Sequence, residues 1–389
     1  MDPALIALFV VAGLSSLFMA WVIGAGSSGA TPFAPAVGAN EISTMRAAFV
    51  VGILGFVGAV TQGANVSEAI GSGLVGGVSL PPTGVIAVLL IGAGLMAVGI
   101  KTGYPVATAF TVTGSVIGVG LALGGEPVWP KYLQIGAVWL FTPFVGGGIA
   151  YAIATVLPRA DVPERLSVAA LAGLVGAVML NVEFAFLGDD GGGSLAGTAQ
   201  QLTGVGQPIG LLVSVLGAAV VAGVVSVDIR RDTVGGLRRV LLSLGSLVAF
   251  SAGGSQVGLA VGPLLPLLDE MPMVSTLAVL VGGGFGMLIG SWTGAPRMIK
   301  SLARDYSSLG PRRSIAALVP SFLIAQLAVL LGVPVSFNEI VVSAIIGSGA
   351  AVGGLEAISF RKIGITIAAW FGSFVLAFLL AFVVATLVL

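Results

Sequence analysis

Residues 25–39 read AGSSGATPFAPAVGA, and this stretch decides the fold that we expect. It follows a long apolar run, yet it combines glycines and two prolines with two serines and a threonine. Pro32 and Pro35 each lack a backbone N–H, and the glycines weaken a helix around them, so no helix is expected to run through the stretch unbroken. In a membrane, broken backbone is tolerated only where it is buried in protein or lines a cavity.

A second stretch of this kind lies in the other half of the chain. Residues 252–264 read AGGSQVGLAVGPL and also follow a long apolar run, so we expect a second break there. Two interrupted helices at corresponding positions of two halves are typical of the binding site of a secondary transporter.

The composition indicates an all-α polytopic membrane protein. The chain has 389 residues, of which 57% are hydrophobic and only 8% charged, whereas soluble domains carry roughly 25% charged residues. The apolar residues form runs of about 20 without alternation, as expected of helices that span a lipid bilayer and not of barrel strands. A net charge of zero argues against a nucleic-acid partner. The absence of cysteine and histidine removes thiolate chemistry and the commonest metal ligands, so we expect no metal site.

About twelve spanning segments follow from the apolar runs. We place them at residues 3–24, 44–62, 82–101, 104–124, 133–157, 166–188, 205–227, 238–253, 273–294, 314–332, 336–356 and 363–389.

The basic residues then predict the orientation. Of the 16 lysines and arginines, only Lys131 falls in an even-numbered loop between these segments. Because cytoplasmic loops are enriched in Lys and Arg, the odd-numbered loops are predicted to be cytoplasmic and both termini to face outward. The expected location is the cell membrane.

Landmarks recur at a nearly constant interval. Ser27 and Ser255 are 228 residues apart, the two Pro-Val pairs that begin at Pro105 and Pro334 are 229 apart, and Trp139 and Trp370 are 231 apart. These intervals match the first segment to the eighth, which is a shift of seven segments. Because an odd shift reverses the direction in which the chain crosses the membrane, the repeats are inverted. We therefore predict a first repeat at 1–160, two linking helices at 161–232 and a second repeat at 233–389.

At these residues the chain resembles the inorganic phosphate transporter (PiT) family. That family has two inverted repeats, each with a GAND-type motif at a broken helix and a later Pro-Val-Ser element. The similar segments here are residues 25–31, 250–256, 105–108 and 334–338, and Val66-Ser67-Glu68-Ala69-Ile70 is similar to the family's Val-Thr-Glu-Thr-Ile element. The resemblance implies the transporter fold and sites for phosphate and a coupling cation at the motif positions.

The motifs depart from the family pattern at the residues that would carry the chemistry. Ser27 and Ser28 replace the Asn and Asp of the first motif, and Ser255 and Gln256 replace those of the second. The histidines that end the Pro-Val-Ser elements become Phe110 and Glu339. The substrate and the coupling chemistry are therefore less constrained by the resemblance than the scaffold is.

A neutral oxyanion site is the arrangement that the remaining residues favour. No Lys or Arg lies well inside an apolar segment, so an anion would be held by hydroxyls, amides and backbone N–H groups at helix ends. For any one of these side chains, helix packing is the alternative role. The candidate substrate-binding residues are Ser27, Ser28, Thr31, Thr108, Ser255, Gln256, Ser336 and Asn338.

Acids in or near apolar segments are candidates for the coupling ion, because they are costly in lipid. Glu339 lies five residues after Pro334, and Glu68 follows the second segment where the family also has Glu. Glu183 has no counterpart in the family and is interpreted as a wetted residue at a helix end.

These observations predict a symporter of inorganic phosphate coupled to Na⁺ or H⁺, with no cofactor apart from the transported ion. Sulfate or another oxyanion is the first alternative, and a passive anion channel or a membrane sensor that no longer transports is the second. No nucleotide-binding loop or catalytic constellation is present, so an enzyme is not expected. The sequence leaves the oligomeric state open, and a homo-oligomer is one possibility.

Overall fold

The computed structural model describes residues 3–159, 161–187, 192–271, 273–354, 356 and 358–389. Asp189 and Asp190, which the predicted topology places in an even-numbered outer loop, lie outside this part. The first predicted repeat contains α1 (Pro3–Gly26), α2 (Ala34–Gly38), α3 (Thr44–Gln62), α4 (Ala64–Ser72), β1 (Val75–Gly76), α5 (Pro82–Thr102), α6 (Thr108–Ala122), β2 (Glu126–Pro127) and α7 (Trp129–Val156). The linking region contains α8 (Glu164–Asn181), α9 (Leu195–Thr203) and α10 (Gln207–Arg231).

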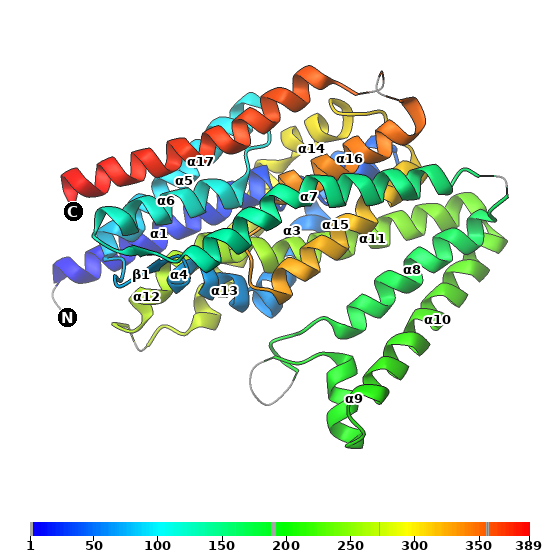
Figure 1. Ribbon diagram of the computed structural model, residues 1–389, viewed down its shortest axis with the longest axis horizontal. Helices are drawn as coiled ribbons and strands as arrows, with labels where there is room; N and C mark the ends of the chain where they lie inside the picture. Colours follow the sequence, from blue (N-terminus) through cyan, green and yellow to red (C-terminus); the bar gives the residue numbers. More distant parts are fainter. Residues whose placement is uncertain (1–2, 160, 188–191, 272, 355, 357) are drawn as a thin grey trace.

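The same order of helices then returns. The second repeat contains α11 (Thr233–Val261), η1 (Gly262–Leu264), α12 (Leu265–Leu268), α13 (Thr276–Thr293), α14 (Ala295–Arg304), α15 (Pro311–Leu330), α16 (Phe337–Gly353) and α17 (Phe360–Val388). In Figure 1 the chain begins and ends at the left end of the molecule, and α7 and α17 run lengthwise in opposite directions. This is the geometry of an inverted repeat.

Each of the twelve predicted segments corresponds to an apolar helix, but two of these helices are too short to cross a membrane. Within the described residues, ten helices are long and apolar enough to cross a membrane. The two remaining predicted segments are the apolar helices α6 and α16, of 15 and 17 residues. Both are shorter than the roughly 20 residues that a crossing needs. Most of their residues are buried, so they are internal helices whose N-terminal ends lie within the protein.

Glycines bring the two repeats into reciprocal contact. A Cβ at Gly58 of α3 would lie 1.8 Å from the carbonyl oxygen of Phe250 in α11. Likewise, a Cβ at Gly290 of α13 would lie 2.0 Å from the carbonyl oxygen of Trp21 in α1. Only glycine allows such close backbone approach. Trp21 and Phe250 are 229 residues apart, and the same interval relates Ser27 to Gln256. The sequence comparison matched Ser27 to Ser255 instead, so the packing corrects that match by one residue.

The predicted break in the second repeat is wrong over most of its length. Helix α1 ends at Gly26 and residues 27–33 form turns, as expected, but α11 continues without interruption to Val261. The glycines of α11 keep their backbone N–H groups and serve packing: a Cβ at Gly253 would lie 1.9 Å from the carbonyl oxygen of Gly55 in α3. Only Pro263 removes a donor, and the α-helix ends just before it.

Two further boundaries differ from the sequence expectation. The sixth segment ends at Asn181 and not near 188, because Val182 is extended and Phe184 pairs with Gly193 in an isolated β-bridge. The short helices α4 and α14, and the antiparallel pair β1–β2, were not expected.

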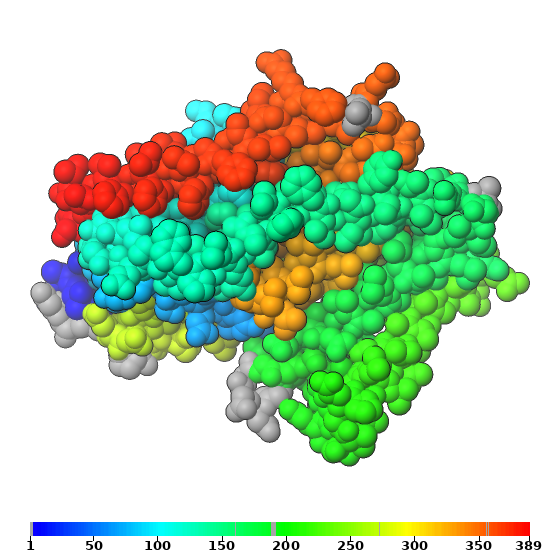
Figure 2. Space-filling model, in the orientation of Figure 1, coloured from blue at the N-terminus to red at the C-terminus, as the bar shows by residue number. Residues whose placement is uncertain are grey.

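The linking helices lie at the edge of the molecule. Helices α8 and α10 pack against each other, and α10 also contacts α11. Figure 2 shows them with α9 as a green group beside the main body, whose centre is formed by the two repeats.

Candidate functional site

The candidate site lies where the two repeats meet inside the protein. Its polar side chains come from the end of α1 and the turn that follows it, from the C-terminal third of α11 and from the first turns of α6 and α16. All eight predicted substrate-binding residues and Glu339 are at most 2% exposed: Ser27, Ser28, Thr31, Thr108, Ser255, Gln256, Ser336, Asn338 and Glu339.

Ser27 and Gln256 form the central contact. The Ser27 hydroxyl donates to Gln256 Oε1 at 3.3 Å, and Gln256 Nε2 donates to the Val335 carbonyl at 2.7 Å. Since the helix packing relates Ser27 to Gln256, each residue touches its own counterpart. A residue can do this only near the axis that relates the repeats, so this pair marks the pseudo-two-fold axis.

Asn338 ties the two short helices to the broken end of α1. Its Nδ2 donates to the Val106 carbonyl at 2.7 Å and to the Gly26 carbonyl at 3.1 Å. Asn338 is in the first turn of α16, and Val106 lies just before α6, so the N-termini of both short helices approach each other beside Ser27. Helix N-termini carry free N–H groups and partial positive charge, and they favour anions.

The two N-termini are capped differently. The Ser336 hydroxyl accepts a hydrogen bond from the Glu339 N–H at 3.4 Å and caps α16. The corresponding residue before α6 is Ala107, which offers no side-chain cap. The first-turn N–H groups of α6 are therefore the more available donors for an oxyanion.

Several buried polar atoms at this site have no hydrogen-bond partner among the described residues. They are Thr108 Oγ1, Ser255 Oγ, Asn338 Oδ1 and Glu339 Oε2. Buried polar groups are nearly always paired, so the unpaired atoms on α11 and on the two short helices are available to a ligand. Thr108 and Ser255 can donate to an oxyanion, while Asn338 Oδ1 and the Glu339 carboxylate can accept from, or coordinate, a cation.

Two predicted residues bond to their own backbone instead. The Thr31 hydroxyl donates to the Ser27 carbonyl at 3.1 Å, and the Ser28 hydroxyl to the Ile23 carbonyl at 3.4 Å. The Ser27 carbonyl also accepts the Ala30 and Thr31 N–H groups at 3.0 Å. These contacts shape the turn after α1, which is the helix-packing role that the sequence left open for them.

The two predicted coupling carboxylates occupy different environments. Glu339 is the only carboxylate among the buried polar residues of the described chain, and no Lys or Arg is among them. It also lines a cavity of about 580 Å³ between α7, α16 and α17. Glu68 lies exposed on α4, and no hydrogen bond or ion pair connects its side chain to the central residues in the described part. Glu339, unlike Glu68, is thus buried next to the central residue Asn338, but none of the predicted substrate-binding residues lines its cavity.

A buried polar group near the site was missed in the sequence. Gln326 of α15 donates to the Ser251 hydroxyl at 2.6 Å and to Gln62 Oε1 at 3.4 Å. Ser251 precedes Ser255 by one helical turn. The sequence did contain an indication of this group: Gln62 ends one apolar segment, and Gln326 lies inside another.

The fold defines an all-α polytopic membrane protein built on inverted repeats. The architecture agrees with a solved structure, "The sodium-dependent phosphate transporter", at a TM-score of 0.82 and 23% identity over 98% of this chain and 100% of that one.

The chain belongs to the phosphate transporter family, whose sequence pattern matches residues 23–381. It is 27% identical to "Putative phosphate permease" of Thermococcus kodakarensis, over 95% of this chain and 94% of that protein. It is also 24% identical to "Inorganic phosphate transporter 2-1, chloroplastic" of Arabidopsis thaliana, over 92% of this chain and 68% of that protein.

Proposed function

We propose that this protein is a symporter that carries inorganic phosphate through the cell membrane by alternating access, coupled to Na⁺ or H⁺. Membership in the phosphate transporter family supports phosphate as substrate. The observation that carries the proposal is the buried meeting point of Ser27, Gln256 and Asn338 between the N-termini of two short helices.

The chemistry of this point suits an oxyanion beside a cation. Thr108 and Ser255 offer hydroxyls that have no partner among the described residues, and α6 offers an N-terminus without a side-chain cap. Asn338 Oδ1 and Glu339 Oε2 are unpaired acceptors on adjacent residues. A site with both kinds of group binds phosphate and a coupling cation together, which is the requirement for symport.

The deep burial of these residues favours a transporter over an open channel. Each is nearly inaccessible from outside the protein, so a ligand reaches the site only after the helices move. Alternating access supplies such movement, because one inverted repeat rocks against the other around a fixed site.

Uptake into proteoliposomes tests the proposal. Purified protein is reconstituted, and entry of labelled phosphate is followed with an inward Na⁺ gradient, with a pH gradient and with neither, with unlabelled sulfate as competitor. Gradient-driven accumulation of phosphate is expected, with weaker competition by sulfate. Preferential sulfate uptake would support the oxyanion alternative. Flux that never exceeds equilibrium would support a channel, and the absence of flux a sensor.

The orientation is part of the same proposal. Both termini face outward, and the basic end of the molecule faces the cytoplasm, because 15 of the 16 lysines and arginines fall in the odd-numbered loops.

A further inference from the structure

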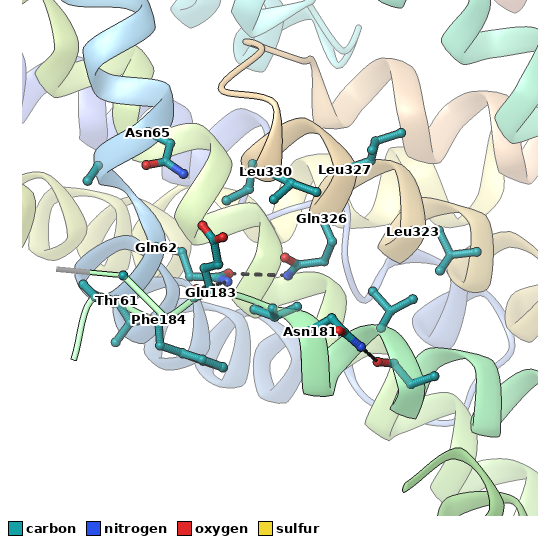
Figure 3. Close-up of a pocket in the computed structure, with 17 residues that line it drawn as sticks. Thr61, Gln62, Asn65, Asn181, Glu183, Phe184, Leu323, Gln326, Leu327 and Leu330 are labelled. Atoms are coloured by element: carbon teal, nitrogen blue, oxygen red, sulfur yellow. Dashed lines mark hydrogen bonds between the residues drawn. The ribbon is translucent and has the colours of Figure 1, made fainter. Parts of the chain in front are cut away.

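A second pocket opens beside the central site, between α3, α8 and α15. Its volume is about 480 Å³, and polar groups from three separate parts of the chain line it. Gln62 and Asn65 come from the α3–α4 region, Gln326 from α15, and Glu183 from the segment after α8. Figure 3 shows the Glu183 carboxylate on the same side of the pocket as the Gln62 and Asn65 amides, with Gln326 facing Gln62.

The charge of this pocket selects against phosphate and in favour of cations. Among the described residues that line it, Glu183 is the only charged one, and none is a lysine or arginine. The Gln62 amide donates to the Glu183 main-chain carbonyl at 3.0 Å, which holds this segment against α3 and leaves the carboxylate free to bind a ligand. Negative charge in a cleft with apolar walls concentrates cations and repels anions.

A row of three polar side chains, here called the polar file, leads from the pocket toward the central site: Gln62, Gln326 and Ser251. Gln326 Nε2 donates one hydrogen bond to Gln62 Oε1 at 3.4 Å and another to the Ser251 hydroxyl at 2.6 Å. Ser251 and Ser255 are one turn apart on the same side of α11, and the Ser255 hydroxyl is unpaired at the central site. Gln62 and Gln326 are each 6% exposed and Ser251 is 0% exposed, so the file runs through the interior.

Two of the three side chains in the polar file have no polar counterpart in the other repeat. The offset of 229 residues places Val22 and Ala97 at the positions that correspond to Ser251 and Gln326. Helices α1 and α5 pack together as α11 and α15 do, yet the corresponding positions hold apolar residues. General helix packing therefore does not require these polar groups. Polar groups inside a membrane protein are costly and mark ion pathways.

We propose that the pocket at Glu183 captures the coupling cation, a monovalent metal ion, and that Gln62, Gln326 and Ser251 line its path to the central site. This inference rests on the proposed function and adds to it a separate cation-binding step. Carboxylate and amide oxygens suit a hard cation, and the path carries no second charge that would trap it. Because Gln326 presents its NH₂ group to both Gln62 and Ser251, its amide must turn its oxygen toward the ion during passage.

The test compares Glu183→Gln with Glu270→Gln in proteoliposomes, using Na⁺ as the probe. Glu270 is an exposed carboxylate after α12 that does not line the pocket. For Glu183→Gln, we expect the Na⁺ concentration for half-maximal phosphate uptake to rise by about tenfold, with the maximal rate and the half-saturating phosphate concentration unchanged. Glu270→Gln is expected to match the unsubstituted protein.

A second readout separates this inference from the proposed function. Na⁺ alone, without phosphate, is expected to raise the thermal unfolding temperature, and Glu183→Gln to require about tenfold more Na⁺ for the same rise. If Na⁺ stabilises the protein in this way but no phosphate enters the vesicles, the cation pocket is supported and the proposed function is wrong. If uptake is normal but Na⁺ has no effect, or if Glu183→Gln changes neither readout, the pocket proposal is wrong.

The path is tested with Gln326→Met, which keeps the length of the side chain but removes both amide hydrogen bonds. We expect Na⁺-driven uptake to slow by about tenfold, while Na⁺ still stabilises the protein through the intact pocket. Equal loss of Na⁺ stabilisation and uptake would show a general structural defect and would contradict a path that is separate from the pocket.

Discussion

Trp139 and Trp370 make the same hydrogen bond in opposite directions between the two repeats. The indole N–H of Trp139 in α7 donates to the Pro334 carbonyl at 2.9 Å, and that of Trp370 in α17 donates to the Pro105 carbonyl at 2.9 Å. Each final helix thus fixes the extended residues before the short helix of the other repeat. The positions of both helix N-termini at the central site consequently depend on the docking of the repeats.

Replacing Trp370 with Phe is expected to destabilise the protein. The variant keeps an aromatic ring but leaves the Pro105 carbonyl without its partner in a buried place, which costs about 1–3 kcal/mol. Thermal unfolding in detergent measures the effect. Trp21→Phe is the control, because the Trp21 indole bonds to the exposed Thr293 hydroxyl and its loss is expected to cost less. Equal effects of the two changes would contradict a special role for the reciprocal bond.

Ser255→Ala is expected to weaken phosphate binding without loss of stability. The hydroxyl is buried and has no hydrogen-bond partner in the described structure, so removing it breaks no hydrogen bond within that part of the protein. If it donates to bound phosphate, its loss costs roughly 1.5–3 kcal/mol, on the order of tenfold to a hundredfold in affinity. The half-saturating phosphate concentration for uptake, together with the unfolding temperature, reports both quantities.

Ser321→Ala is the matched control for this prediction. Ser321 is also fully buried, but its hydroxyl donates to the Ala317 carbonyl of its own helix at 2.8 Å. We expect phosphate affinity to stay unchanged in this variant. An unaltered affinity in Ser255→Ala, or an equal loss in Ser321→Ala, would remove Ser255 from the phosphate site.

Single cysteines in this cysteine-free chain test the orientation. Leu195→Cys lies in α9 on the predicted outer side, and Val234→Cys lies at the start of α11 on the predicted inner side; both native side chains are exposed. A reagent that cannot cross the membrane is expected to label position 195 in intact cells and to reach position 234 only after lysis. The reverse pattern would place the termini in the cytoplasm.

The sequence predicted the helices because their determinants are local. Pro105 and Pro334 begin the extended segments before α6 and α16, and Trp139 and Trp370 recur at a similar interval, so the repeat could be recognised without coordinates. The break after Gly26 was also predicted, because two prolines follow within ten residues.

The errors arose where tertiary packing decides the outcome. Gly253 and Gly254 resembled helix breakers, but they lie against α3, where only glycine fits, and α11 stays helical. The pairing of Ser27 with Gln256 required the register of the packed helices, because a shift of one residue cannot be detected among glycines and serines. The file through Gln62 and Gln326 joins separate segments, and a sequence does not say which helix faces meet.

Glu339→Gln is expected to uncouple transport from its driving ion. Glu339 is buried in the first turn of α16 beside Asn338, and its Oε2 has no partner in the described structure. The amide keeps the shape but can neither carry a negative charge nor take up a proton. Gradient-driven net uptake should fall by on the order of tenfold or more. Exchange of internal for external phosphate, which needs no net ion movement, should continue in the same vesicles.

Glu68→Gln is the comparison, because Glu68 is exposed on α4 and lies outside the central group. If Glu68→Gln abolishes coupling while Glu339→Gln leaves it intact, the ion follows a route through α4 and the role assigned to Glu339 is wrong.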